Sequence, residues 1–286
     1  MGVKDIAYTG LIHGYRAVAS LFMDVPEAPR KHDCFAVSVQ TVEDVAPRVR
    51  RIVVEGPALR VYRPSGPDEY FGLVIPPKGR ELVLPKAKGL NVRAELEAID
   101  EKDRPELRWY TVRHHDESQG RLTFDVVTHG ESGPGSAWAL RAEAGEEVGI
   151  RTMTSTWRRT GGGQLLVADP TSAPALRRIL EECGRQELAT THVRIAASSP
   201  DLLEPGYDSL TSELASYRDF FVPEGEEAAA VADELREGGK LPIAYGWLCG
   251  EASLARAARK VLVKEWNIPR TDVLFSGYYR RQRGSL

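Results

Sequence analysis

Cysteine is scarce in this sequence, and the three present, Cys34, Cys183 and Cys249, lie far apart and form no CxxC pair. An odd number of widely spaced cysteines argues against a disulfide framework and a structural zinc site, and it fits a reducing compartment. No stretch approaches the roughly 18 apolar residues of a membrane-spanning helix. The residues after Met1 also lack the basic and apolar regions of a signal peptide. We therefore expect a cytoplasmic protein with no membrane span.

An excess of charge of either sign is absent as well. Lys and Arg number 38 against 41 Asp and Glu, a formal net charge of −3, which argues against a nucleic-acid partner. His114, His115 and His129 lack a convincing set of neighbouring ligands, so we expect no dedicated metal site. The composition is that of an ordinary globular protein, and a chain of 286 residues is long enough for two domains.

The first half of the chain is rich in short apolar stretches typical of strands. Between about Cys34 and Met153, five or six segments rich in β-branched and aromatic residues are bounded by Gly, Pro or Asp. One of them is the stretch Leu107–His115 (LRWYTVRHH). With a single helical stretch over 137–143, this pattern predicts a small antiparallel barrel.

The pattern changes after Arg158–Gly163 (RRTGGG), a glycine run that indicates a linker. Apolar runs then alternate with helical stretches, including an expected helix over 210–217, which predicts a parallel sheet with crossover helices. The predicted division of the chain is an N-terminal extension (1–33), a β-barrel domain (34–157) and an α/β domain (158–286).

Three segments carry more chemistry than folding requires. The first is Arg108–Arg113 (RWYTVR). In a strand, Arg108 and Tyr110 point to the same side, which places a flat apolar ring beside an anion-binding guanidinium. A flavin dinucleotide needs such a pair. The alternative is a barrel strand whose arginines reach solvent.

The second segment is His129–Trp138 (HGESGPGSAW), which follows a predicted strand and precedes the helical stretch. Gly133–Ser136 would lie at a helix N-terminus, where free backbone N–H groups and the helix dipole favour a phosphate. The alternative is a Gly/Pro turn in which Ser136 is an ordinary N-cap.

The third segment is Tyr245–Glu251 (YGWLCGE), together with Gly277–Arg281 (GYYRR) near the end of the chain. A strand that ends in Cys-Gly-Glu before a helix places these residues at the carboxyl edge of a sheet, where ligands of such sheets bind. The alternative is that Cys249 is a small buried core residue and that Tyr278 and Tyr279 are aromatics of an edge strand.

Together these segments resemble the siderophore-interacting protein family, the NAD(P)H-dependent ferric-siderophore reductases of the ferredoxin-reductase superfamily. Arg108–Arg113 matches the family's RxYTxR flavin motif, and His129–Trp138 matches its HG…GPxSxW segment. Ala168–Ala175 is similar to GDxTALPA, Trp247–Glu251 to WxAGE, and Gly277–Arg281 to a terminal GYWRRG. The agreement in order and spacing extends over about residues 34–284.

The resemblance implies a six-stranded antiparallel FAD-binding barrel followed by a parallel-sheet NAD(P)H-binding domain. It also implies electron transfer from NAD(P)H through FAD to an Fe(III)-siderophore, which releases Fe(II). By resemblance, the flavin would contact Arg108, Tyr110, Thr111, Arg113, His129, Gly130, Gly133 and Ser136. The nicotinamide nucleotide would contact Asp169, Thr171, Cys249, Glu251 and Tyr279. Candidate substrate-binding cations are Lys86, Lys88, Arg280 and Arg281.

The sequence departs from the family pattern at the expected nucleotide entrance. Ala168 stands where Gly is usual, Pro170 replaces an acidic residue, and Tyr279 replaces Trp. Two alternatives therefore stay open: a general NAD(P)H:flavin or ferredoxin-type reductase with another acceptor, and a non-enzymatic module that binds flavin and siderophore. A ferredoxin is an alternative electron donor.

The donor preference is read from the end of the second strand of the α/β domain. There Ser198 and Ser199 stand where an acidic residue would select NADH, so we expect NADPH to be preferred. The alternative is that both serines only cap the loop.

Overall fold

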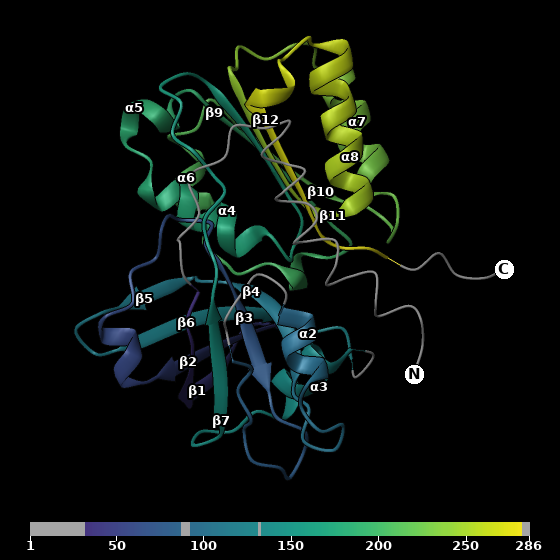
Figure 1. Ribbon diagram of the computed structural model, residues 1–286. Helices are drawn as coiled ribbons and strands as arrows, with labels where there is room; N and C mark the ends of the chain where they lie inside the picture. The colour runs from purple at the N-terminus through teal and green to yellow at the C-terminus, as the bar shows by residue number, and fades with distance from the viewer. Residues whose placement is uncertain (1–31, 87–91, 131–132, 282–286) are drawn as a thin grey trace, which may run out of the picture. The chain divides into compact units, whose positions relative to one another are not determined.

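Figure 1 shows a computed structural model of the chain, which describes residues 32–86, 92–130 and 133–281. These residues form two compact units, and the division between them lies between Thr156 and Trp157. Each unit has its own sheet and its own hydrophobic core. No helix in the described ranges is long and apolar enough to cross a membrane.

Seven antiparallel strands make up the sheet of the first unit: β1 (Cys34–Ala46), β2 (Val49–Glu55), β3 (Tyr70–Ile75), β4 (Glu106–Thr111), β5 (His114–Asp116), β6 (Arg121–Val127) and β7 (Glu147–Thr152). Their order in the sheet is β4-β3-β7-β1-β2-β6-β5. One continuous stretch of chain joins the two edges, because the Val112 N–H donates to Glu69 before β3 and the Arg113 N–H donates to Thr123 of β6. The sheet therefore closes into the predicted barrel.

Alternating side chains of these strands fill the barrel. Ile52, Leu73 and Leu122 are fully buried in one cluster, and the rings of Phe71 and Phe124 meet edge to face at 5.3 Å. This alternation is what a barrel with one packed and one solvated face requires.

The barrel has seven strands rather than the six that the resemblance implied, and it differs from the prediction at two places. The stretch LRWYTVRHH, expected as one strand, forms β4 and β5, because the chain changes partner at Val112 and Arg113. The helix expected over 137–143 is α3 (Pro134–Arg141) and begins three residues earlier. The barrel also carries helix α2 (Val92–Glu97) and the 3₁₀ turn η1 (Pro57–Arg60), which were not predicted.

Five parallel strands make up the sheet of the second unit: β8 (Gln164–Ala168), β9 (Thr191–Ala197), β10 (Ser216–Phe221), β11 (Tyr245–Glu251) and β12 (Val273–Tyr279). Their order is β10-β9-β8-β11-β12, and every neighbouring pair is parallel. The helices are α4 (Ala173–Glu182), α5 (Arg185–Leu188), α6 (Asp208–Thr211), α7 (Glu227–Glu237) and α8 (Ala252–Lys260). The prediction of a parallel sheet with crossover helices is confirmed.

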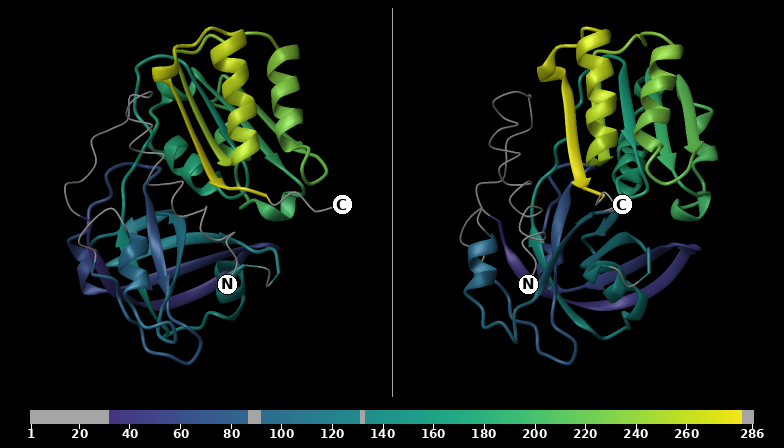
Figure 2. Two further views of the ribbon diagram at one scale, coloured as in Figure 1. Left: turned by 45° about the vertical axis from the view of Figure 1, so that its right-hand side comes forward. Right: turned by 90° about the vertical axis from the view of Figure 1, so that its right-hand side faces the viewer.

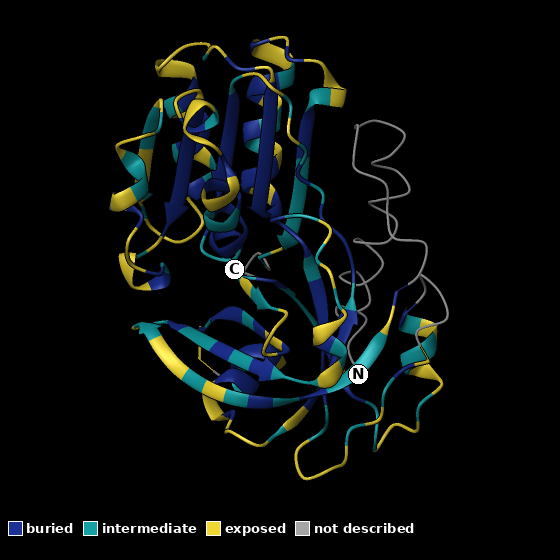
Figure 3. Ribbon diagram, turned by 90° about the vertical axis from the view of Figure 1, so that its left-hand side faces the viewer, coloured by how far each residue is buried: buried dark blue, intermediate teal, exposed yellow. Residues whose placement is uncertain are grey.

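Helices cover both faces of this sheet (Figure 2). Leu166 and Trp247 pack in the cluster that contains α4, whereas their neighbours Leu165 and Leu248 pack in the cluster that contains α7 and α8. The three central strands are buried along their whole length (Figure 3). Burial on both faces explains the nearly continuous apolar runs of their sequences.

The prediction of a helix over residues 210–217 is wrong. Only α6, which ends at Thr211, is helical there, and the chain from Ser216 onward is the edge strand β10. Tyr217 packs in the cluster on the α4 side and Phe220 in the cluster on the α7 side. These residues face opposite sides of the sheet, as strand residues three apart must.

Candidate functional site

In the barrel unit, β4 and the start of α3 meet at a glycine. A Cβ placed on Gly135 would collide with the Tyr110 hydroxyl and would lie 3.3 Å from Cγ of Arg108. Because Gly135 lacks this atom, the first turn of α3 lies directly against both side chains. The sequence predicted Gly135 within the helix N-terminus Gly133–Ser136 but did not predict its contact with Arg108 and Tyr110.

The chemistry at this contact combines a cation, a ring and a helix N-terminus. The Arg108 guanidinium lies 3.0 Å from Glu106 Oε2 and donates to the Leu107 carbonyl at 2.7 Å, and its side chain is 32% exposed. Burial raises the pKa of the Tyr110 hydroxyl, which therefore stays neutral. A guanidinium beside a helix N-terminus suits a phosphate, and the adjacent ring offers a flat apolar surface.

The turn before α3 is held by Ser136. Its buried hydroxyl donates to the Gly130 carbonyl at 2.6 Å and accepts from the His129 N–H at 3.1 Å. The N-cap of α3 is Gly133, and it makes no side-chain cap. The alternative of Ser136 as an ordinary N-cap is therefore wrong. Its hydroxyl instead fixes the shape of the turn, which leaves the backbone of the first turn as the donor to an anion.

The remaining flavin candidates in the barrel are placed as follows. Thr111 is buried at the end of β4, and Arg113 uses its N–H to close the barrel. His129 and Gly130 are exposed, and Gly130 has a positive φ of 74°. Arg108, Tyr110, Gly133 and Ser136 thus lie around the start of α3, while Thr111 and Arg113 lie further along the same stretch of chain.

In the second unit, the ends of β8 and β11 bring predicted nucleotide residues together. Asp169 accepts from the N–H of Thr171 at 2.8 Å through Oδ1 and from the N–H of Glu251 at 2.7 Å through Oδ2. Asp169 and Glu251 are far apart in the sequence, so the sheet topology creates this contact. Both residues lie at the carboxyl edge of the parallel sheet, as expected.

Glu251 begins α8. Its carboxylate accepts from the N–H of Ser253 at 2.5 Å and from the N–H of Arg281 at 3.2 Å. Burial alone would raise the pKa of Glu251, but these hydrogen bonds outweigh it and lower the pKa. Tyr279 lies opposite Glu251 in the β11–β12 register. Burial raises the pKa of Tyr279, and the negative charge of Asp169 raises it further by a smaller amount, so the Tyr279 hydroxyl stays protonated.

Three further candidate residues are Cys249 and the two serines that follow β9, Ser198 and Ser199. The Cys249 side chain is fully buried in the core cluster on the α4 side, while its carbonyl accepts from the Ser172 hydroxyl at 2.9 Å. Ser198 is exposed. Ser199 accepts from the N–H of Asp201 at 3.2 Å and so caps a 3₁₀ turn.

The predicted substrate cations differ in how far they are already paired. Lys86 and Arg280 are exposed, and Lys88 lies outside the described residues. The Arg281 guanidinium donates to Glu227 at 2.9 and 3.0 Å and lies 3.1 Å from Glu224. Within its own unit, Arg281 is therefore an ion-pair partner.

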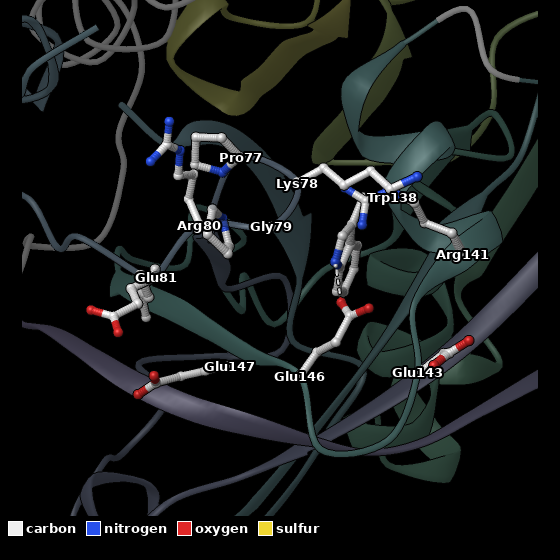
Figure 4. Close-up of a pocket in the computed structure, with 12 residues that line it drawn as sticks. Pro77, Lys78, Gly79, Arg80, Glu81, Trp138, Arg141, Glu143, Glu146 and Glu147 are labelled. Carbon is white, nitrogen blue, oxygen red and sulfur yellow. Dashed lines mark hydrogen bonds between the residues drawn. The ribbon is translucent and has the colours of Figure 1, made fainter. Parts of the chain in front are cut away.

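A pocket of about 460 Å³ in the barrel unit contains none of the predicted site residues. Figure 4 shows that charges of both signs line it, four glutamates (Glu81, Glu143, Glu146 and Glu147) and three cations (Lys78, Arg80 and Arg141). Trp138, the last residue of the second motif, donates to Glu146 there at 3.0 Å. This mixture of charge favours neither an anionic nor a cationic ligand.

Known proteins resemble this chain in sequence and in fold. Ferric vibriobactin reductase ViuB of Vibrio cholerae is 26% identical over 206 residues, which are 67% of this chain and 71% of ViuB. The siderophore-interacting protein SipS from Aeromonas hydrophila has a TM-score of 0.72 at 22% identity and covers 90% of this chain and 94% of its own. A siderophore utilization protein from T. fusca has a TM-score of 0.71 at 22% identity, with 91% and 98% covered.

Two family models match, one in each structural unit. The model described as the siderophore-interacting FAD-binding domain matches residues 38–153, and the model described as siderophore-interacting protein matches residues 162–282. The predicted fold class, a barrel followed by a parallel α/β domain, is confirmed by these matches together with the two sheets. The chain belongs to the siderophore-interacting protein family, and its barrel is the family's FAD-binding domain.

Proposed function

We propose that this protein is a cytoplasmic ferric-siderophore reductase that takes electrons from a reduced nicotinamide nucleotide. The observation that carries the proposal is the meeting of Arg108, Tyr110 and Gly135 in a barrel of the siderophore-interacting FAD-binding family. The relative ViuB, named a ferric vibriobactin reductase, supports the same activity. The proposed domains are 34–157 for FAD and 158–286 for the nucleotide.

The barrel residues fit FAD. The missing Cβ of Gly135 leaves the backbone of the first turn of α3 against the side chain of Arg108, and this is where the FAD pyrophosphate would bind. Tyr110 would pack against the isoalloxazine ring, and Thr111 would hydrogen-bond near its N5. The other proposed flavin contacts are Arg113, His129, Gly130, Gly133 and Ser136.

FAD, when bound, accepts electrons as a hydride pair and can release them singly. One reduced nicotinamide therefore serves two ferric siderophores, with the products NAD(P)⁺, two Fe(II), two free siderophores and one proton. Oxygen donors hold Fe(II) less strongly than Fe(III) because its charge is lower, so reduction releases the iron. The chain's own contribution is to bind and orient the reactants.

The second unit would bring the nicotinamide to the flavin. Asp169, Thr171, Cys249, Glu251 and Tyr279 would line its approach, and NADPH is the proposed donor, with a ferredoxin as the alternative. Lys86, Lys88, Arg280 and Arg281 are proposed to attract the ferric siderophore. Of these, Arg281 would have to share its charge with Glu227.

The test is anaerobic reduction of the FAD-loaded protein. NADPH or NADH should bleach the visible flavin absorbance. A ferric hydroxamate or ferric catecholate should then restore it, with Fe(II) trapped by a ferrous chelator. If no ferric chelate reoxidises the flavin even after chemical reduction, the protein is not a ferric-siderophore reductase. Reoxidation by a quinone alone would favour a general flavin reductase.

A further inference from the structure

The chain order of the parallel sheet reverses between β8 and β11. β9 and β10 lie on the β8 side of this reversal point and β12 lies on the β11 side. In such sheets ligands bind at the reversal point, and a dinucleotide pyrophosphate rests on the N-terminus of the helix after the first strand. Here that helix is α4, whose N-cap is Ser172, and Asp169, only 3% exposed, lies in the short connection between β8 and this helix.

The backbone donors at the start of α4 are already bound to Asp169. The N–H of Thr171 donates to Oδ1 at 2.8 Å, and the N–H of Ser172 approaches Oδ1 at 3.2 Å and the Asp169 carbonyl at 3.1 Å. The N–H of Ala173 donates to the same carbonyl at 2.8 Å. The next residue, Pro174, has no N–H. The groups that would hold a phosphate are therefore occupied by a residue of the chain itself.

The end of β11 is also bound to this carboxylate. Oδ2 of Asp169 accepts from the N–H of Glu251 at 2.7 Å. A Cβ on Gly250, whose φ is +133°, would lie 2.6 Å from Cγ of Asp169, so only glycine leaves room for this carboxyl group. The hydroxyl of Ser172, the N-cap of α4, connects the start of this helix to β11 by donating to the Cys249 carbonyl at 2.9 Å.

The charges around the reversal point oppose a second anion. Glu251 lies on the β11 side, and the negative charges of Asp169, Glu227 and Glu251 all act on Tyr279. Arg281, the cation that acts on Tyr279, is already paired with Glu227 and Glu224. Burial raises the pKa of Asp169, and the hydrogen bonds that its two carboxyl oxygens accept from Thr171, Glu251 and Ser172 act against this rise by favouring the charged form. A pyrophosphate placed here would meet these oxygens at short range, and oxygens of like partial or full charge repel one another.

We propose that Asp169 is a built-in anion that fills the phosphate position at the start of α4. The chain then takes its nicotinamide donor without anchoring the donor's pyrophosphate at this helix. Asp169 is thus a specificity-determining residue, because it lowers the advantage of a full dinucleotide over a reduced nicotinamide mononucleotide. The proposal rests on the proposed function only for the identity of the donor.

The direct test is calorimetric titration of the FAD-saturated full chain with inorganic pyrophosphate and, separately, with ADP. Asp169→Gly empties the position and should bind pyrophosphate at least about tenfold more tightly than wild type, as expected for one or two hydrogen bonds to a charged group. Asp169→Asn should gain less, because its carbonyl oxygen still accepts from Thr171 and Ser172. Asp219→Asn removes one exposed charge from the same unit and should change nothing.

Two results would overturn the proposal. One is equal pyrophosphate affinity in wild type and in an Asp169→Gly protein that keeps its circular dichroism and FAD content. The other is an equal gain in Asp219→Asn, which would show that net charge alone is responsible.

A second measurement needs no variant. In wild type, reduced nicotinamide mononucleotide should reduce the flavin with a kcat/KM within about tenfold of that for NADH, because no pyrophosphate contact at α4 is lost. A larger advantage for NADH would overturn the proposal. If neither donor reduces the flavin, the proposed function fails, while the pyrophosphate titration still decides the role of Asp169.

Discussion

Arg281 and Glu227 form a two-pronged ion pair that joins the chain just after β12 to the first turn of α7. Nη1 lies 2.9 Å from Oε2, and Nη2 lies 3.0 Å from Oε1. The planar guanidinium fits a carboxylate in this way, whereas a lysine would not. Because the N–H of Arg281 also donates to Glu251, the pair holds the end of β12, and with it Tyr279, against the edge of the sheet.

This ion pair predicts a pH-dependent stability. Burial alone would raise the pKa of Glu227, but hydrogen bonds from Arg281 and Gly225 outweigh burial and lower the pKa. Such a carboxylate stabilises the fold above its unfolded pKa of about 4.3, and the stabilisation is lost as the pH falls through the lower folded pKa. We expect Glu227→Gln to lower the free energy of unfolding by about 1 kcal/mol at pH 7.

Urea unfolding of wild type and Glu227→Gln from pH 7 to below about pH 4 measures this effect. The difference between the two proteins should shrink at the acid end. Glu224→Gln is the control, because Glu224 is 69% exposed and contacts the same arginine. A difference that stays constant across the pH range would show that the charge of Glu227 is not its source.

Arg108→Ala should weaken FAD retention by roughly ten- to hundredfold, because the pyrophosphate would lose a hydrogen bond to a charged group. The measurement is flavin content after extensive dialysis. Arg121→Ala is the matched control, since it removes another barrel arginine, one that pairs with Glu55 on the surface. Equal flavin content in Arg108→Ala and wild type would mean that Arg108 does not hold the pyrophosphate.

Gly135→Ala should destabilise the barrel by about 1–3 kcal/mol, because the added methyl group collides with the Tyr110 hydroxyl. Flavin content should fall as well, since Tyr110 must move. Gly133→Ala is the control for stability only, because Gly133 is itself a proposed flavin contact. Its Cβ would meet only Cε1 of His129 at 3.5 Å, and its φ of −141° suits any residue. Thermal unfolding checks both variants, and equal melting temperatures would contradict the close contact at Gly135.

The sequence revealed the barrel and the parallel sheet because burial sets their periodicity. Arg108 and Tyr110 could be placed together because residues two apart in a strand share a face. The helix expected over 210–217 failed for a similar reason. Leu210, Leu214 and Tyr217 follow helical spacing and all pack in the same cluster, yet Tyr217 belongs to β10. Local spacing cannot show which residues will pair with a neighbouring strand.

The role of Asp169 could not be predicted from the sequence. Its partners Thr171 and Ser172 are local, but Gly250 and Glu251 come from a strand about 80 residues later. Only the parallel pairing of β8 with β11 brings them to the carboxylate. In the same way, nothing local in Gly277–Arg281 indicated that Arg281 pairs with Glu227, because α7 lies between β10 and β11 in the chain.

We expect the donor preference to be set at the end of β9. An acidic residue at the end of the second strand binds the ribose 2′-hydroxyl and repels a 2′-phosphate. β9 is the second strand and lies beside β8. The residues that follow it are Ser198, which is exposed, and Ser199, which caps a turn by accepting from Asp201. The alternative that both serines cap the loop therefore holds for Ser199, whose hydroxyl accepts a hydrogen bond and can still donate its own proton. Ser198 is not the capping residue of this turn.

We therefore expect kcat/KM to favour NADPH over NADH, and Ser198→Asp to reverse the preference. The new carboxylate would repel the 2′-phosphate and lower kcat/KM for NADPH by about tenfold or more, while NADH, which has only a hydroxyl there, would lose little. Ser212→Asp is the control, because it adds the same charge at another exposed position in this unit. Steady-state rates with both donors decide the matter. A wild-type preference for NADH would mean that Ser198 and Ser199 do not face the 2′-phosphate. The lack of a carboxylate at the end of β9 would then not decide which donor is bound.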